Sequence, residues 1–334
     1  MSFYSIDIVQ SCIDKTKKFF SGPDLKSKWL KIGILVFIYS ILSGGGGGGS
    51  GFSSGSESGS GVGNIENQIQ NLINSITPEM WTMIFIGGAL VFLFLVILGI
   101  ILTLIRNMTF FSILESIETN SIGILSYFKK FYSKAISLTI FELIVGLLMI
   151  PLMLGFTTLV IGGIFLGFGF DASILGPIAF IVSLPLLIIL GLFVFVLAFV
   201  FGIITFIINQ FARYWMYKKE MSAFEAFKKS FSLALSNVIE IIVMIIVKAV
   251  LGVGSLIITI IVAIGIGIPF AIIGAIFAVI AIIFIAGAPI LLVPAILLAI
   301  IGLFLYVLVL TIALAPIQVF FFYYDLAFLE KLLK

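Results

Sequence analysis

Two stretches of the sequence contain no charged residue. Residues 249–324 extend over 76 positions without Asp, Glu, Lys or Arg, and residues 172–212 extend over 41. A helix that crosses a bilayer needs about 20 consecutive apolar residues, so each stretch holds at least one membrane span. Only 10% of all residues are charged and 62% are hydrophobic, whereas soluble domains have about 25% charged residues. The chain is therefore predicted to be an integral membrane protein.

The composition also excludes several kinds of site. The sequence contains no histidine, and Cys12 is its single cysteine. Disulfides within the chain, Cys/His zinc sites, His-ligated haem and a histidine general base are therefore excluded, and we expect no cofactor. The formal net charge is only +3, and the basic residues lie beside the apolar runs, as membrane topology requires. We therefore expect no nucleic-acid partner.

A basic, aromatic segment at 213–237 lies between the two uncharged runs. Ser222 and Glu225 have the spacing of a capping box, which predicts the start of a helix. Glu225 can also support Lys229 at i,i+4. Apolar residues then recur at helical spacing and form a stripe of Phe224, Phe227, Phe231 and Leu235. Such a helix is expected to lie along the membrane surface, with its aromatics in the bilayer and its lysines among the headgroups.

Two more segments have this amphipathic character, at 5–20 and at about 109–134. The first is predicted to present Ile6, Val9, Ile13 and Phe20 on its apolar face. In the second, Ser112 and Glu115 repeat the capping-box spacing, and Asn120-Ser121 is expected to break the helix. We call all three segments elbow helices, because the chain is expected to turn from each of them into the bilayer.

Each elbow contains the pattern Lys-Lys-any-aromatic-Ser, at spacings of 112 and 99 residues. This similarity favours a repeat of elbow plus helical hairpin, although any membrane elbow needs lysines and aromatics, and both interpretations stay open. A basic residue beside a membrane is attracted to anionic lipids. The residues expected to contact anionic headgroups are Lys17, Lys18, Lys129, Lys130, Lys228 and Lys229.

The predicted fold class is all-α, a polytopic bundle of about six transmembrane spans with three interfacial elbow helices. Residues 1–334 form one membrane domain with parts at 1–106, 107–212 and 213–334. A Gly/Ser-rich tract at 44–63 is expected to be an external loop. Pro78 is expected to begin a helix whose span, 81–105, ends at Arg106. Residues 270–287 remain over and are interpreted as a re-entrant or outer-leaflet segment.

The distribution of basic residues predicts the topology. Lys and Arg gather at 15–31, 106–134, 213–229 and 331–334, whereas the loops at 43–80 and 170–172 contain neither. By the positive-inside rule, the elbows and both termini are expected on the cytoplasmic side of the cell membrane.

Three charges lie inside or near the edges of predicted spans, namely Glu142, Glu240 and Lys248. In one interpretation, the two glutamates lie near the headgroups and pair with elbow lysines. In another, all three form a cluster in the bundle interior that neutralises itself or binds a substrate, with Lys248 facing inward. A serine–lysine hydrolase based on Lys248 is a third alternative, but no serine stands out as its partner. The polar residues Asn209, Gln210, Asn237 and Gln318 are expected to cap helices or bridge them.

Several segments together resemble a known family. They are SIDIVQSCIDKTKKFFSGPDLKSKWLKIGILVFIYSIL at 5–42, the glycine tract, SILE at 112–115 and VFFFYYDLAFL at 319–329. These resemble an uncharacterised family of archaeal polytopic membrane proteins with a Gly-rich first external loop. More weakly, MSAFEAFKKSFSLALSN at 221–237 is similar to the membrane domain that accompanies glycerophosphodiester phosphodiesterases. Neither resemblance implies an active site in this sequence.

The function that these features favour is a non-enzymatic membrane organiser or accessory subunit, acting through lipids or a partner membrane protein. The alternative is a transporter or lipid-translocating protein that uses Glu142, Glu240 and Lys248. No catalytic, cofactor-binding or metal-binding residue is predicted, since Glu115 and Glu118 have the spacing of a metal pair but are expected to face solvent.

Overall fold

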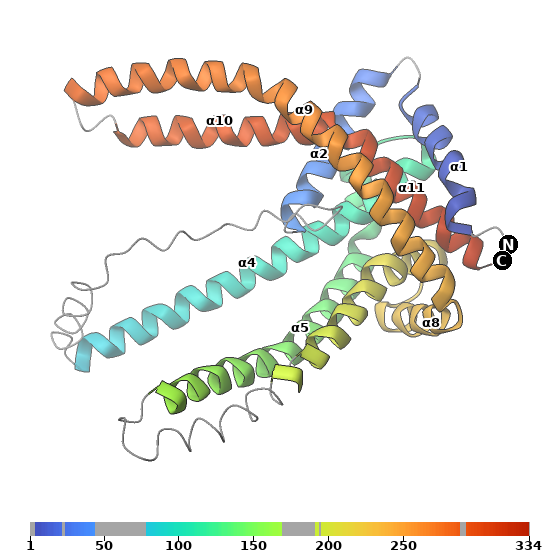
Figure 1. Cartoon of the computed structure of the whole chain (residues 1–334), viewed down its shortest axis with the longest axis horizontal. Coiled ribbons are helices and arrows are strands. Elements are labelled where there is room, and N and C mark those ends of the chain that lie inside the picture. The colour runs from blue at the N-terminus through green and yellow to red at the C-terminus, as the bar shows by residue number, and fades with distance from the viewer. Residues whose placement is uncertain are drawn as a thin grey trace.

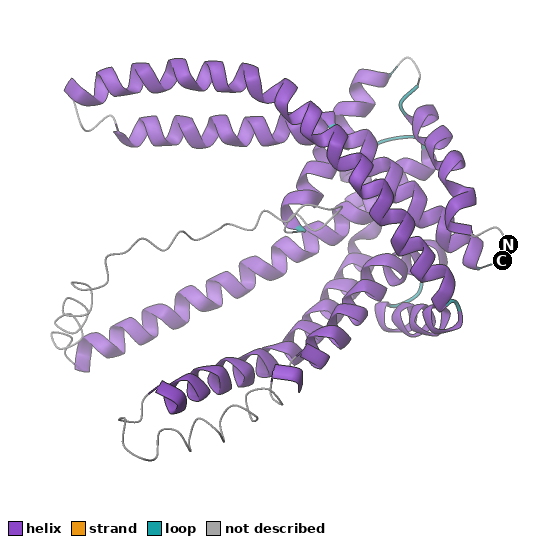
Figure 2. Ribbon diagram, viewed as in Figure 1, coloured by secondary structure: helices purple, strands orange, loops and turns teal. Residues whose placement is uncertain are grey.

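The computed structural model describes residues 4–21, 24–43, 78–168, 191–193, 195–287 and 292–333, and these form helices and short connections without a strand (Figure 2). The helices are α1 (Tyr4–Phe19), α2 (Leu25–Leu42), α4 (Pro78–Thr119), α5 (Ile124–Phe168), η2 (Ile208–Ala212), α7 (Arg213–Lys219), α8 (Ala223–Ser236), α9 (Val238–Gly287), α10 (Leu292–Ala313) and α11 (Ala315–Leu332). Residues 191–193 and 195–207 are also helical and lead into η2. The all-α prediction is confirmed. The Gly/Ser tract at 44–63 and the predicted loop at 170–172 lie outside the described residues.

The molecule consists of a packed body and long arms that extend from it (Figure 1). Helices α4, α5 and α9 contain 42, 45 and 50 residues. At 1.5 Å per residue they are about 63–75 Å long, roughly twice the 30 Å thickness of a bilayer's hydrocarbon core. Each of these helices therefore has one part in the body and another in an arm.

The body is held together by aromatic side chains from helices far apart in sequence. Phe110 of α4 contacts the rings of Tyr214 and Phe322 at centroid distances of 5.3 and 5.7 Å. Phe111 stacks on Phe131 of α5 at 5.7 Å. Such pairs add stabilisation to the burial of their apolar area. They join the body ends of α4, α5, α7 and α11 into one core.

The arms expose apolar side chains on nearly all sides. Phe85 of α4 is 80% exposed and Leu303 of α10 is 65% exposed. A soluble protein does not leave apolar surface of this extent in water. Five helices are long and apolar enough to cross a membrane, at Thr82–Thr119, Ile124–Ile150, Gly191–Lys219, Val238–Val279 and Val293–Ala313. The chain is therefore a multi-pass membrane protein, with five candidate spans among the described residues, and the predicted number of about six is not confirmed.

The second predicted elbow is not a separate helix. Helix α4 begins at Pro78, as expected, but continues through Arg106 to Thr119. Ser112 lies inside this helix and its hydroxyl donates to the carbonyl of Met108, so the predicted capping box there is wrong. The helix break at Asn120-Ser121 is confirmed, since Asn120 has φ of 53°. Residues 109–134 thus form the body ends of α4 and α5 and the turn between them.

The first and third elbows do form helices of their own. Helix α1 buries Ser5, Ile8, Cys12 and Phe19, so its most buried stripe is displaced by one residue from the predicted one, and Ile6 is exposed. Helix α8 begins as predicted, because the Ser222 hydroxyl accepts from the backbone N–H of Glu225. Its buried side consists of small residues, Ala223, Ala226 and Ser230.

Residues 270–287 are the far part of α9 and not a separate re-entrant segment. Helix α9 continues to Gly287 with Pro269 inside it. It forms a helical hairpin with α10, in which the Tyr306 hydroxyl donates to the carbonyl of Ala263 at 3.3 Å. Ring contact between Phe270 and Tyr306 at 5.5 Å supports the same pairing. Tyr306 of α10 thus packs beside the part of α9 that contains Pro269.

The two ends of the chain lie together in the body (Figure 1). Helix α1 packs on α11, and the Tyr324 hydroxyl donates to the carbonyl of Ser5 at 3.2 Å. Ser43 at the end of α2 lies beside the body end of α4, where it lines a cavity with Arg106. Pro78 begins the same helix 28 residues earlier, about 42 Å away along its axis. Ser43 and Pro78, the described residues on either side of 44–77, therefore lie at opposite ends of the α4 arm.

Cys12 provides a test of the packing of α1. Its side chain is fully buried, and burial raises the pKa of the thiol to about 11 from an ordinary 9.0. At pH 8 the folded protein then contains about 100-fold less thiolate than an unfolded chain. We expect iodoacetamide to modify Cys12 only after denaturation, as measured by mass spectrometry.

The same shift gives a pH dependence. The free energy of unfolding keeps the full contribution of the raised pKa below pH 9. It loses this contribution as the pH rises through about 11, because the unfolded chain gives up the thiol proton first. Rapid alkylation at pH 8 in mild detergent would show that α1 does not pack on α11 as described.

Candidate functional site

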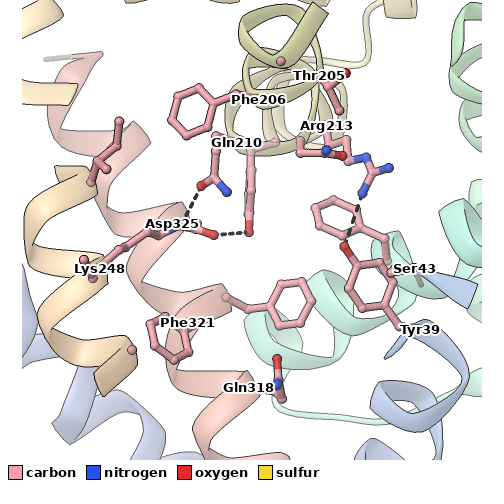
Figure 3. Close-up of a pocket in the computed structure, with 18 of the residues that line it drawn as sticks. Tyr39, Ser43, Thr205, Phe206, Gln210, Arg213, Lys248, Gln318, Phe321 and Asp325 are labelled. Carbon is pink, nitrogen blue, oxygen red and sulfur yellow. Dashed lines mark hydrogen bonds and ion pairs between the residues drawn. The ribbon is translucent and has the colours of Figure 1, made fainter. Parts of the chain in front are cut away.

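A cavity of about 1070 Å³ lies where the arms meet the body. Its lining comes from α2, the helical segment 195–219, α4, α9 and α11 (Figure 3). One group of lining residues is polar or charged: Tyr39, Ser43, Arg106, Thr205, Asn209, Gln210, Arg213, Lys248, Gln318 and Asp325. The other is apolar: Phe110, Phe201, Phe206, Ile245, Val253, Leu256, Phe321 and Phe322. The cavity is therefore amphipathic.

The first charged group at the cavity is centred on Glu142 of α5. One carboxylate oxygen accepts from Arg106 of α4 at 2.5 Å, and the other accepts from Arg213 of α7 at 2.7 Å. Asn107 donates a further hydrogen bond to the same carboxylate at 3.0 Å. A buried carboxylate needs such partners, because taking a charge out of water is costly. Glu142 thereby joins α4, α5 and α7.

The two arginines are held by further contacts. Arg213 is 3% exposed and donates to the hydroxyl of Tyr39 at 3.3 Å. Its guanidinium also lies over the ring of Phe110, 5.2 Å from the centroid, which is a favourable cation–π position. Asn107 donates to the Thr139 hydroxyl at 3.1 Å and so fixes the amide beside Glu142. Each of these side chains from α2, α4, α5 and α7 is therefore held in place by contacts with the others.

The second charged group pairs Lys248 of α9 with Asp325 of α11 (Figure 3). Lys248 also donates to the side-chain oxygen of Gln210 at 2.5 Å, and the Tyr214 hydroxyl donates to Asp325 at 3.2 Å. Burial raises the pKa of Asp325, and the neighbouring Lys248 ammonium opposes that rise. The group links α9, α11 and the helical segment 195–219 across the cavity.

A π-helical turn positions the amides of this second group. Residues Ile208–Ala212 form η2, one turn of π-helix between the apolar helix 195–207 and α7. Such turns shift the helix face and are frequent at functional sites. Here the turn contains Asn209 and Gln210, both of which line the cavity, and is followed directly by Arg213. The irregularity thus gathers polar groups at the end of an otherwise apolar helix.

Comparison with known families places the chain in one of them. Residues 3–334, nearly the whole chain, match the Family of unknown function (DUF7544). The chain belongs to this family. No curated protein and no solved structure matches it. The DUF7544 assignment agrees with the resemblance to an uncharacterised membrane-protein family, but it gives neither an archaeal origin nor a relation to phosphodiesterase-associated domains.

In this DUF7544 member Glu142, Glu240 and Lys248 do not form the interior cluster of one interpretation, and Glu142 pairs with arginines and not with the elbow lysines of the other. Glu142 pairs with two arginines, and Lys248 pairs with a different carboxylate, that of Asp325. Glu240 lies in the first turn of α9, where its backbone carbonyl accepts from the Ser5 hydroxyl at 3.5 Å. Lys248 faces the interior and meets a carboxylate, as predicted, although the partner is neither of the two glutamates expected.

Three site residues were not identified from the sequence: Arg106, Arg213 and Asp325. The arginines lie next to apolar runs and were interpreted as topology signals. Asp325 is the acidic residue within the aromatic segment 319–329, and this position was its only signal. The expected bridging role is confirmed for Gln210, which bonds Lys248, and the capping role for Asn237, whose amide donates to the carbonyl of Leu233 at the end of α8.

The lysines expected at the membrane surface are all exposed. They are Lys17, Lys18, Lys129, Lys130, Lys228 and Lys229. Lys130 pairs with Glu115 at 2.6 Å, and Lys229 pairs with Glu225 at 3.3 Å, so the predicted i,i+4 support is confirmed. Every one of them is thus accessible to a charged partner.

Glu115 and Glu118 join α4 to α7 in the body. Both accept from the Tyr217 hydroxyl, at 2.9 and 2.6 Å, and Glu118 also pairs with Lys218. The prediction that Glu115 faces solvent is therefore wrong, because its carboxylate binds a side chain of α7. Among the described residues, no group of three or more metal-ligating side chains is present.

Proposed function

We propose that the protein binds a membrane lipid in the cavity at the base of its arms and acts through that lipid. The observation that supports this best is the amphipathic lining of the cavity, with charged and amide side chains beside a set of aromatic and aliphatic ones. Its volume of about 1070 Å³ lies at the upper end of ligand sites, which measure about 300–1,000 Å³. A headgroup with the first part of its chains suits these dimensions.

The position of the cavity supports the same ligand. Its apolar side belongs to helices that continue into the exposed arms, such as α9 with Ile245 and Val253. Acyl chains can therefore follow the arm surfaces while the headgroup stays at the base, because apolar chains gain free energy on apolar surface. This arrangement fits an organiser or accessory subunit that acts through lipids, which needs only binding.

A transporter or lipid-translocating protein is the second candidate. The supporting observation is that charged residues of two ion-paired groups line one cavity from different helices: Arg106 and Arg213, which pair with Glu142, and Lys248 with Asp325. Charges in such positions often mark a substrate path. If the protein is an organiser, it should still bind lipid when Lys248 and Asp325 are replaced together by apolar residues. If it is a transporter, the same replacement should abolish translocation of its substrate. The similarity of 221–237 to phosphodiesterase-associated membrane domains suits either lipid role.

Filling the cavity tests the proposal. Gly202 and Gly252 both line it, and a Cβ added at either position would meet no atom within 4 Å. A Gly202→Leu/Gly252→Leu variant adds two side chains to the cavity and removes two helix-disfavouring glycines. Native mass spectrometry of the purified protein should show one retained lipid in the wild type and at least tenfold lower occupancy in this variant.

The matched control is Gly265→Leu, also on α9. A Cβ at Gly265 meets no atom either, and this residue does not line the cavity. It should retain lipid like the wild type. A wild type that purifies without lipid, or equal retention in all three proteins, would contradict the proposal.

The proposed topology has the body, both termini and α8 on the cytoplasmic side of the cell membrane. The clustering of Lys and Arg beside the body ends of the helices supports it. Single cysteines at Ser54, outside the described residues, and at Ser222 should react with an impermeant maleimide from opposite sides, in a Cys12→Ser background. Labelling of both cysteines from outside intact cells would contradict this orientation.

Helix α8 is proposed to lie in the membrane interface. Its small residues pack on the body, while Phe224 is 69% exposed and Leu235 is also exposed. Lys228 is exposed as well, which suits anionic headgroups. A nitroxide at Phe224→Cys should collide more with oxygen than with a nickel chelate in bilayers, and a label at Lys229→Cys, which is exposed on a different face of α8, should show the opposite. Equal accessibility at both sites would place α8 away from the lipid.

A further inference from the structure

The charges around the cavity do not balance. Arg106, Arg213 and Lys248 are cationic, and the two carboxylates paired with them belong to Glu142 and Asp325. One positive charge is left over at a site that faces apolar helices. An uncompensated charge in such surroundings is unfavourable, because little water is present to solvate it. The imbalance calls for a ligand with negative charge.

The surplus belongs to the arginine side of the cavity. Lys248 and Asp325 neutralise each other, whereas Arg106 and Arg213 share the single carboxylate of Glu142. Both arginines still have a buried Nε–H that finds no hydrogen-bond acceptor among the residues that the structure describes. The buried Ser43 hydroxyl, which also lines the cavity, has no hydrogen-bond partner within the described part of the chain either. Figure 3 shows Ser43 beside Tyr39, which contacts Arg213.

We infer that the cavity holds its ligand by an anionic group, a phosphate or carboxylate, bound against Arg106, Arg213 and Ser43. This inference rests on the proposed lipid-binding function and names the headgroup chemistry. Two guanidinium N–H groups and a hydroxyl are donors that suit anionic oxygens, and arginine is well matched to phosphate and carboxylate. The apolar side of the cavity takes the chains of the same molecule. The ligand is therefore an anionic amphiphile.

The choice of variant follows from the charge count. Arg106→Gln removes the surplus charge and leaves Glu142 paired with Arg213, so no carboxylate loses its last partner. Lys26→Gln changes the net charge equally but lies exposed in the first turn of α2, away from the cavity. Ser43→Ala removes one donor without any charge, and so serves as a second variant that disturbs folding least.

The experiment is a lipid competition on the full-length protein in neutral detergent. Dioleoyl phosphatidylglycerol and dioleoyl phosphatidylcholine, which have the same chains, compete for the protein, and native mass spectrometry measures each occupancy. The wild type and Lys26→Gln should prefer the anionic lipid by about tenfold, the value of one charge-assisted hydrogen bond. Arg106→Gln should bind both lipids equally, and Ser43→Ala should show a reduced preference.

The outcomes separate the inference from the proposed function. Equal binding of both lipids by the wild type overturns the anionic site and leaves lipid binding intact. Binding of neither lipid overturns the proposed function. Inorganic phosphate distinguishes the two sources of the anion: a protein that retains neither lipid but binds millimolar phosphate, and loses this binding in Arg106→Gln, would support the anion site and assign it to a soluble ligand. An unchanged preference in Arg106→Gln would contradict the assignment to these arginines.

Discussion

Replacement of Glu142 by glutamine is expected to lower the free energy of unfolding by about 3–5 kcal/mol, the usual cost of removing one partner from a buried ionic group. The change leaves Arg106 and Arg213 facing each other without the carboxylate that both contact. Asn107 and Thr139 remain, but they are neutral. The measurement is the unfolding midpoint of purified protein in mixed micelles, followed by the loss of helical signal.

The matched control is Glu225→Gln. Glu225 also pairs with a cation, Lys229, at 3.3 Å, but both side chains are about half exposed. An exposed i,i+4 pair contributes only about 0.2–0.5 kcal/mol, so this variant should unfold almost like the wild type. Equal effects of the two substitutions would mean that Glu142 is solvated and does not organise the junction of α4, α5 and α7.

Lys248 and Asp325 are expected to depend strongly on each other. Lys248→Met leaves a buried carboxylate, and Asp325→Leu leaves a buried ammonium and removes the acceptor of Tyr214. Each single variant should lose about 3 kcal/mol of unfolding free energy. The double variant should lie within about 1 kcal/mol of the wild type, because an apolar pair of similar volume can replace a buried ion pair.

A double-mutant cycle measures this dependence as a coupling energy. With a loss of about 3 kcal/mol in each single variant and at most about 1 kcal/mol in the double variant, the cycle at Lys248 and Asp325 should give a coupling energy of at least about 5 kcal/mol. The same cycle at Glu225 and Lys229, with Glu225→Leu and Lys229→Met, should give at most about 0.5 kcal/mol. Additive losses at Lys248 and Asp325 would show that the two charges do not form the pair described.

The sequence predicted well what is determined by neighbours along the chain. The start of α8 at Ser222, the start of α4 at Pro78 and the break at Asn120 each follow from one residue type in one local conformation. The membrane class follows from apolar runs of sufficient length. These features need no knowledge of which helices meet.

The site could not be predicted in the same way. Glu142 meets Arg213 across 71 positions, and Lys248 meets Asp325 across a still longer separation. An arginine at the end of an apolar run looks the same in sequence whether it lies among headgroups or pairs inside the protein. Arg106 is an example: it was predicted to mark the end of a membrane span, but α4 continues past it for 13 residues to Thr119. Its role follows from the packing of helix ends, which periodicity does not specify.

The continuity of α4 has a mechanical consequence. One unbroken helix extends from Pro78 at the tip of its arm to Thr119 in the body, and Arg106 lies on it at the cavity. Helices respond to a bilayer thicker or thinner than their apolar length by changing tilt. When one end of a continuous helix tilts, its other end must also move. A change in bilayer thickness would therefore shift Arg106 relative to Arg213 and alter the distance between the two side chains. In this way α4 would couple the thickness of the surrounding bilayer to the geometry of the proposed lipid site.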